Sequence, residues 1–72
     1  MGKARKVSPG KYKHFKGQVY IVIGVASHTE GDYKMVVYYS ENKPEELYCR
    51  PLEMFLEKVL VKDIYVPRFE KC

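Results

Sequence analysis

Apolar and polar positions alternate along most of the chain, which predicts β-strands rather than helices. The stretch "QVYIVIGVAS", residues 18–27, is apolar on both of its faces, so it is expected to be a central strand whose two faces are at least partly covered. Gly24 interrupts this strand and is typical either of a bulge or of a close approach by another backbone. We favour the bulge, because a small sheet has to bend.

Two polar turns and two further strands follow. "YKMVVYYS", residues 33–40, alternates in the same way and pairs back as a hairpin whose tip lies at Gly31 and Asp32. The polar segment "ENKPEE", residues 41–46, is expected to be a turn because Pro44 cannot donate to a strand ladder. The short strand "LYCR", residues 47–50, then completes a three-stranded meander.

The segment "RPLEMF", residues 50–55, breaks the alternation and predicts a single helical or 3₁₀ turn with Pro51 in its first turn. Strands are expected again at 56–61 and 64–72, joined by a turn at Lys62 and Asp63, and Pro67 places the last strand at an edge. Five strands and one helical turn in a chain of 72 residues predict a mainly β protein. The specific expectation is a small, strongly bent, SH3-like five-stranded barrel.

The length allows one domain with a small core, which leaves little room for an interior catalytic cleft. We expect a flexible basic N-terminal tail at 1–8 and a single domain at 9–72. The longest apolar run is strand-sized and the N-terminus lacks the apolar segment of a secretory signal, so we expect a cytoplasmic protein that does not associate with membranes. Cys49 and Cys72 show no metal-binding spacing and are expected to be free thiols.

The net charge of +4 is unevenly distributed. Up to Thr29 the chain has six Lys or Arg and no acid, whereas from Glu30 onward it has seven Lys or Arg and nine acids. Lys11, Lys13 and Lys16 alternate with aromatic residues and are the candidates for contacts with nucleic-acid phosphates. A solvated basic face explains the same pattern.

The chemical inventory does not favour catalysis. His14, His28 and Cys49 have neither the local signature of a nucleophile with its base nor the spacing of a zinc site, so we expect no enzyme activity, no metal and no cofactor. Aromatic and Arg residues often dominate binding interfaces. The candidate binding residues are His14, Lys16, His28, Tyr38, Arg50 and Glu53, and the expected core residues are Phe15, Leu52, Met54, Phe55 and Phe69. For Arg50 the alternative is structural, as a partner of Glu53 or as a cap of nearby carbonyls.

Five motifs in a fixed order carry a family resemblance: "HFKG", "YIVIGVASH", "VVY", "RPLEMF" and "VPRF". With these motifs the chain, from Pro9 to Glu70, resembles the small bacterial domain-of-unknown-function family 1653. The resemblance implies a compact SH3-like β-barrel and no particular reaction. The turns "GDYK" and "VKDI" depart from the family pattern, so they affect specificity carried by loops rather than the fold.

Two classes of function remain open. The first, which we favour, is a binding module that recognises a protein or peptide partner through aromatic, Arg and His side chains, or through an open strand edge. The second is an RNA- or DNA-binding module that uses the N-terminal lysines and exposed aromatic rings. An accessory role in a larger complex also stays open, as does the choice between a monomer and a weak dimer.

Overall fold

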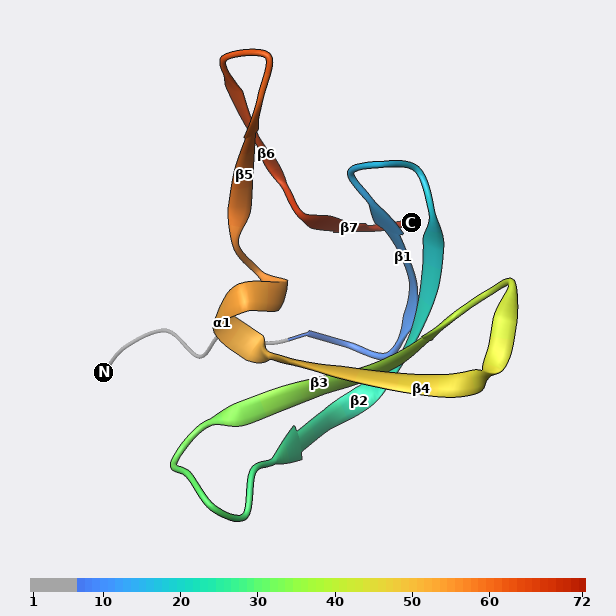
Figure 1. Cartoon of the computed structure of the whole chain (residues 1–72), viewed down its shortest axis with the longest axis vertical. Coiled ribbons are helices and arrows are strands. Elements are labelled where there is room, and N and C mark those ends of the chain that lie inside the picture. The colour runs from blue at the N-terminus through green and yellow to red at the C-terminus, as the bar shows by residue number, and fades with distance from the viewer. Residues whose placement is uncertain (1–6) are drawn as a thin grey trace.

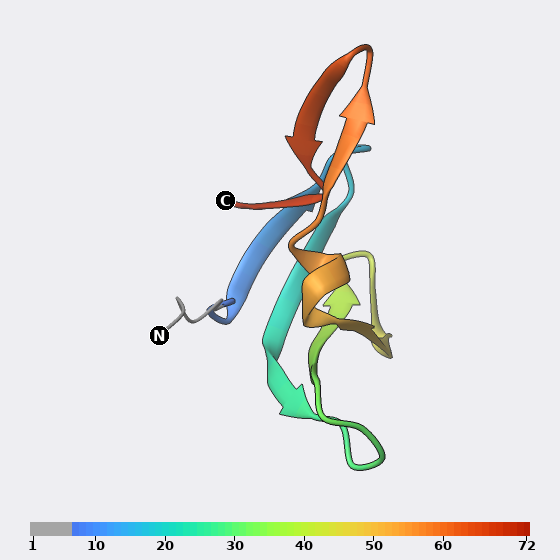
Figure 2. The same ribbon diagram turned by 90° about the vertical axis from the view of Figure 1, so that its left-hand side faces the viewer.

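An open five-stranded antiparallel sheet and a separate hairpin make up the computed structural model, which describes residues 7–72 (Figure 1). The sheet has the strand order β4-β3-β2-β1-β7, and β5 pairs with β6 alone. The β5–β6 hairpin projects away from the sheet in both views (Figures 1 and 2). The elements are β1 (Gly10–His14), β2 (Val19–Ser27), β3 (Lys34–Ser40), β4 (Lys43–Pro51), α1 (Leu52–Phe55), β5 (Lys58–Val61), β6 (Ile64–Pro67) and β7 (Phe69–Lys71).

One face of the sheet, which we call the inner face, carries the core. Residues paired across neighbouring strands share a face, and the pairs Tyr12 with Tyr20 and Val22 with Tyr38 both lie on this one. Helix α1 covers part of it, because Phe55 is 1% exposed and its ring stacks on Phe69 at a centroid distance of 4.2 Å. The buried core residues are Val7, Tyr12, Val22, Val36, Tyr38, Phe55 and Phe69.

The predicted helical turn is confirmed as α1, which begins directly after Pro51. Leu52 and Phe55 are three residues apart, so they lie on the same side of the turn and pack against the sheet. Met54 points the other way and is 49% exposed. The prediction that Met54 lies in the core is therefore wrong. The same prediction is wrong for Phe15, which lies in the β1–β2 turn and is 37% exposed.

The predicted bulge at Gly24 is confirmed. The pairing of β2 with β3 shifts register between Val22 and Gly24, which leaves Ile23 unpaired and 51% exposed. A Cβ atom built at Gly24 would meet no atom within 4 Å. The glycine therefore serves the bend of the strand rather than a close backbone approach.

The predicted closure into an SH3-like five-stranded barrel is not confirmed. Within residues 7–72 the sheet is open, with β4 and β7 as its two edges. Two strand assignments also differ from the prediction. β1 is a strand that the alternation pattern did not predict, and β4 begins at Lys43 instead of after the polar turn. Pro44 is accommodated because β4 is an edge strand, on which the missing N–H of proline can face away from the ladder.

Part of the predicted N-terminal tail lies within the described residues. Val7 is buried in the core, and the carbonyl of Ser8 accepts a hydrogen bond of 3.0 Å from the Tyr12 hydroxyl. Residues 1–6 lie outside the described part of the chain. In the described part, no helix is long and apolar enough to cross a membrane.

Candidate binding site on the inner face

The part of the inner face beside α1 is lined by aromatic rings from four strands. Phe69 of β7 lies at the centre, with ring-centroid distances of 5.0 Å to His14, 5.6 Å to Tyr20 and 5.6 Å to Tyr38. All three contacts are edge-to-face, the arrangement that aromatic pairs favour. We call this cluster, together with Arg50 and Arg68, the inner-face site.

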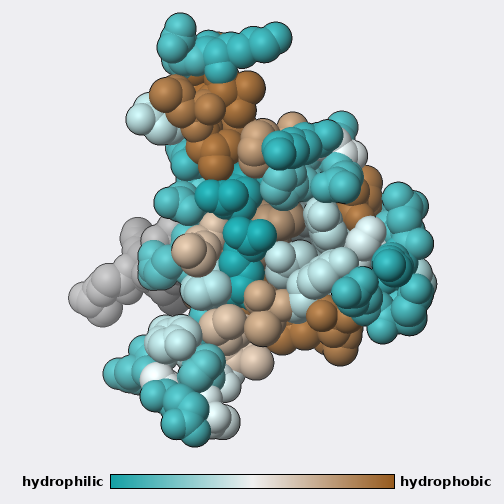
Figure 3. Space-filling model, viewed as in Figure 1, coloured by the Kyte–Doolittle hydropathy of each residue, from teal (hydrophilic) through white to brown (hydrophobic). Residues whose placement is uncertain are grey.

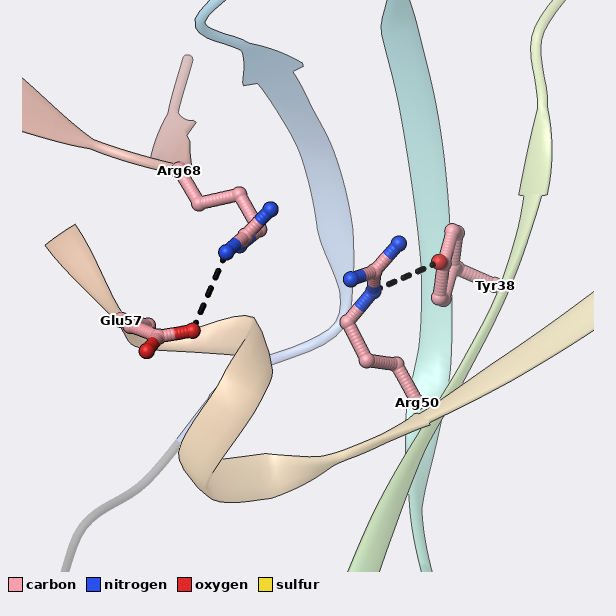
Figure 4. A network of polar contacts seen from close by, with 4 residues as sticks. All are labelled: Tyr38, Arg50, Glu57 and Arg68. Carbon is pink, nitrogen blue, oxygen red and sulfur yellow. Dashed lines mark hydrogen bonds and ion pairs between the residues drawn. The ribbon is translucent and has the colours of Figure 1, made fainter. Parts of the chain in front are cut away.

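Arg50 is placed on this site by the register of β4. It pairs with Val36 of β3, whose side chain is fully buried on the inner face, so Arg50 lies on the same face. Its Nε donates a hydrogen bond of 3.3 Å to the Tyr38 hydroxyl (Figure 4). The guanidinium carbon lies 5.8 Å from the centre of the Phe69 ring. These contacts hold the planar group over the aromatic cluster.

Arg68 comes from the connection between β6 and β7. Its Nη2 donates to Oε1 of Glu57 at 3.0 Å, and its backbone N–H donates to the Glu57 carbonyl at 2.9 Å. Its Nε is buried and has no hydrogen-bond partner among residues 7–72. Figure 4 shows the side chains of Arg68 and Arg50 entering the site from opposite sides, with the Arg68 guanidinium on Glu57 and the Arg50 guanidinium on Tyr38.

His14, the last residue of β1, completes the site. Its Nδ1 accepts a hydrogen bond of 3.2 Å from the backbone N–H of Lys16, so the neutral ring carries its proton on Nε2. Burial lowers the pKa of His14 below its ordinary value of 6.5, and the positive charges of Arg50, Arg68 and Lys16 lower it further. His14 is therefore neutral at pH 7 and presents an N–H donor.

The structure brings together three of the six predicted binding residues, His14, Tyr38 and Arg50, with Lys16 in the adjoining turn. Tyr38 is only 5% exposed, so its hydroxyl positions Arg50 while its ring lies in the core. Sequence reasoning missed Arg68 and Tyr20. The available signal for Arg68 was its place in the "VPRF" motif, since aromatic and Arg residues often dominate binding interfaces.

Two predicted binding residues lie elsewhere. His28 follows the far end of β2, where its Nδ1 accepts from the backbone N–H of Glu30 at 3.0 Å and its ring stacks on Tyr33 at 4.7 Å. It therefore helps to hold the β2–β3 turn. Glu53 lies on α1 and is exposed. The Nε of Arg50 is held by the Tyr38 hydroxyl rather than by Glu53, which was the structural alternative for Arg50.

The three lysines proposed for phosphate contacts do not form one patch. Lys11 and Lys13 alternate with Tyr12 and His14 along β1, so they point to the opposite, outer face. The Nζ of Lys11 also pairs with the Glu41 carboxylate at 3.1 Å. Lys16 lies near His14, and its Nζ is 5.9 Å from the centre of the Phe15 ring.

Two depressions of about 460 and 390 Å³ flank α1, and neither is lined by His14, Arg50 or the aromatic cluster. Figure 3 shows strongly hydrophilic residues at the centre of this view, between the apolar β5–β6 hairpin and an apolar band below. Among residues 7–72, no three His, Cys, Asp or Glu side chains lie close enough to hold a metal ion, and Cys49 and Cys72 are exposed free thiols.

The fold and the site define a small, mainly β domain with an aromatic and cationic face. The model of the family described as protein of unknown function (DUF1653) matches residues 10–71, and the chain belongs to this family. A crystal structure of a DUF1653 protein from Bordetella bronchiseptica is similar, with a TM-score of 0.79 and 31% sequence identity over 92% of this chain and 87% of that one. No curated protein matches the sequence.

Proposed function

We propose that this domain is a binding module that recognises an extended segment of a protein partner along the edge strand β4 and on the adjoining inner-face site. The observation that carries the proposal is the half-buried guanidinium of Arg50, which is fixed by Tyr38 and Phe69 at the edge of the sheet. Aromatic and Arg side chains that are held in place before binding are typical of the residues that dominate interfaces.

Only part of the β4 edge is suited to pairing with a partner strand. No strand within residues 7–72 pairs with its outer side. Lys43, Pro44 and two acidic residues, Glu45 and Glu46, occupy its first half, and such residues protect an edge against pairing. Residues 47–50, in the second half, contain no proline, and Pro51 is the last residue of the strand. A segment that pairs there would place its alternate side chains beside Tyr48 and Arg50.

An RNA- or DNA-binding function has less support. Nucleic-acid binding needs several cations along the path of the backbone, whereas Lys11 and Lys13 point away from the aromatic cluster. A protein segment needs only a strand edge and a few anchoring side chains. The proposed partner is therefore a protein segment rather than a nucleic acid.

Peptide display tests the proposal. Random 16-residue peptides are selected on the full chain, and the enriched peptides are measured against Tyr48→Ala and Leu47→Ala. These neighbours on β4 point to opposite faces, so the change at Tyr48 is expected to weaken binding about tenfold, whereas the change at Leu47 should have little effect. Methylation of alternate peptide amide nitrogens is expected to abolish binding, because it removes the donors for strand pairing.

The proposal fails if both variants bind the peptides equally, if amide NMR shifts map away from β4 and the inner-face site, or if no peptide is enriched. Titration with a single-stranded RNA at low and at moderate salt tests the alternative, nucleic-acid binding. Saturable RNA shifts at His14, Lys16 and Arg50 that fade with salt would favour nucleic acid instead.

A further inference from the structure

We propose that Arg50, Arg68 and His14 together bind a single carboxylate of the partner segment, from an Asp or Glu side chain or from a chain end. The proposal rests on the proposed function for the source of this carboxylate. Its chemistry rests on the inner-face site itself, where Arg50 of β4 and Arg68 of the β6–β7 connection (Figure 4) both lie near His14 of β1.

Among residues 7–72, the contacts of the site neutralise its positive charges only in part. Arg50, Arg68 and Lys16 all lie near enough to His14 to act on it electrostatically. Glu57 pairs with Arg68, whereas Arg50 donates to a neutral hydroxyl. Gathering two guanidinium groups near one histidine costs electrostatic free energy, most of all where water is partly excluded. An anion between them would convert this repulsion into attraction.

The donors suit a carboxylate. A guanidinium is a planar fork that matches the two oxygens of a carboxylate, and its charge strengthens the hydrogen bonds. Nε of Arg50 is occupied by Tyr38, which leaves the terminal nitrogens for a ligand. Neutral His14 adds the Nε2 donor, because its Nδ1 already accepts from Lys16. Tyr20, Tyr38 and Phe69 form an aromatic floor that excludes water below the anion.

One anion fits the site better than a nucleic-acid backbone does. The cations are gathered at one point, and Lys11 and Lys13, which would have to continue a track of phosphates, lie on the outer face. Binding would also couple to protonation. The titratable and charged groups around His14 are Tyr20 on β2, Tyr38 on β3, Arg50 on β4, Arg68 with its partner Glu57, and Lys16 in its own turn. An anion beside these cations favours the charged form of His14.

The test uses the full chain and a blocked glutamate, N-acetylated and C-amidated, as a probe that has one carboxylate and no strand-forming length. Blocked glutamine is the neutral isostere, and chloride keeps the ionic strength constant. We expect saturable NMR shifts at the His14 ring and at the Arg50 and Arg68 side chains with glutamate only. Saturation should raise the pKa of His14, and the affinity should increase as the pH falls toward that pKa.

Matched variants separate a defined site from general charge. Arg50→Gln and Lys13→Gln each remove one positive charge, but from opposite faces of the sheet. We expect about tenfold weaker glutamate binding for Arg50→Gln and unchanged binding for Lys13→Gln. Arg68→Lys keeps the charge and loses the fork, so it should also weaken binding. If Arg50→Gln does not fold, two measurements still test the carboxylate site: the change in the pKa of His14 when glutamate binds the unmodified chain, and glutamate binding by Arg68→Lys.

Shifts that do not saturate, equal losses for Lys13→Gln and Arg50→Gln, or tighter binding of inorganic phosphate or single-stranded RNA would overturn the carboxylate site. The failure of each proposal is distinguishable. If blocked glutamate binds but no displayed peptide does, the carboxylate site stands and the peptide-binding function falls. If the peptides bind Arg50→Gln and Arg68→Lys as tightly as the unmodified chain, the function stands and the carboxylate site falls.

Discussion

His14 is held in surroundings that oppose its own positive charge. Burial and three neighbouring cations lower its pKa in the folded chain below 6.5, whereas the unfolded chain keeps the ordinary value. As the pH falls through 6.5, the unfolded state therefore takes up a proton before the folded state does. The contribution of His14 to stability is complete above pH 6.5 and decreases below it.

Thermal unfolding measured between pH 5 and pH 8 checks this expectation. The melting temperature should fall below pH 6.5 in the unmodified chain, and His14→Gln should flatten this part of the curve, because glutamine does not titrate. His28→Gln is the matched control, since His28 lies at the far end of β2. An equal slope for the unmodified chain and His14→Gln would contradict the assigned environment.

The ring and the hydroxyl of Tyr38 have different roles. Its ring belongs to the core, and its hydroxyl accepts the Nε hydrogen bond of Arg50. Tyr38→Phe keeps the ring and should reduce the free energy of unfolding by about 0.5–1.5 kcal/mol. It should also weaken the binding of blocked glutamate, because Arg50 loses its anchor.

The neighbouring Tyr39 provides the control for Tyr38, since it points to the outer face of β3. Urea unfolding and the NMR titration with glutamate are measured on Tyr38→Phe and Tyr39→Phe in parallel. Glutamate binding by Tyr38→Phe that equals that of Tyr39→Phe would show that the hydroxyl does not position Arg50.

Among the elements, the β5–β6 hairpin has a turn that its residues fit poorly. Lys62 and Asp63 connect paired residues Val61 and Ile64 and have φ angles of 50° and 66°. Two-residue hairpin turns of this kind favour glycine at the second position. Asp63→Gly should therefore stabilise the hairpin by about 0.5–1 kcal/mol. The substitution removes the strain of aspartate in the left-handed conformation, and this gain exceeds the entropy that the glycine backbone loses on folding.

Amide hydrogen exchange of the hairpin measures the effect of Asp63→Gly. Slower exchange across Val59 and Val66 is expected, whereas Lys58→Gly, in the regular part of β5, should make exchange faster. If Asp63→Gly also accelerates exchange, aspartate makes a contribution to the turn that outweighs its backbone strain.

The elements also explain how far the sequence could predict the fold and the site. β2 and β3 were predicted because β-branched and aromatic residues fill both stretches between polar turns, and α1 because "RPLEMF" breaks this pattern. β1 was missed because its inward residues, Tyr12 and His14, are outnumbered by lysines and glycine. Arg68 lies between two short strands, where alternation does not define the direction of a side chain. Barrel closure depends on contacts between distant elements, which no local pattern encodes.

At the scale of the whole molecule, the described chain consists of two hydrogen-bonded units of unequal strength. The buried core packs on the five-stranded sheet, whereas β5 and β6 pair only with each other and expose Leu60, Ile64 and Tyr65 by 57–67%. The hairpin is tied at its base by Arg68, whose backbone N–H and side chain both bond to Glu57. This arrangement is typical of a segment that opens without global unfolding.

Native-state hydrogen exchange should therefore show weaker protection in β5 and β6 than in β2 and β3. Glu57→Gln removes the ion pair at the base, so it should accelerate exchange in the hairpin and leave the central strands unchanged. Glu41→Gln breaks the exposed ion pair with Lys11 on the outer face and serves as the control. Equal acceleration in all strands would mean that hairpin and sheet open as one unit. If the hairpin alone responds, the position of Arg68, and with it the proposed carboxylate site, depends on whether the hairpin is closed.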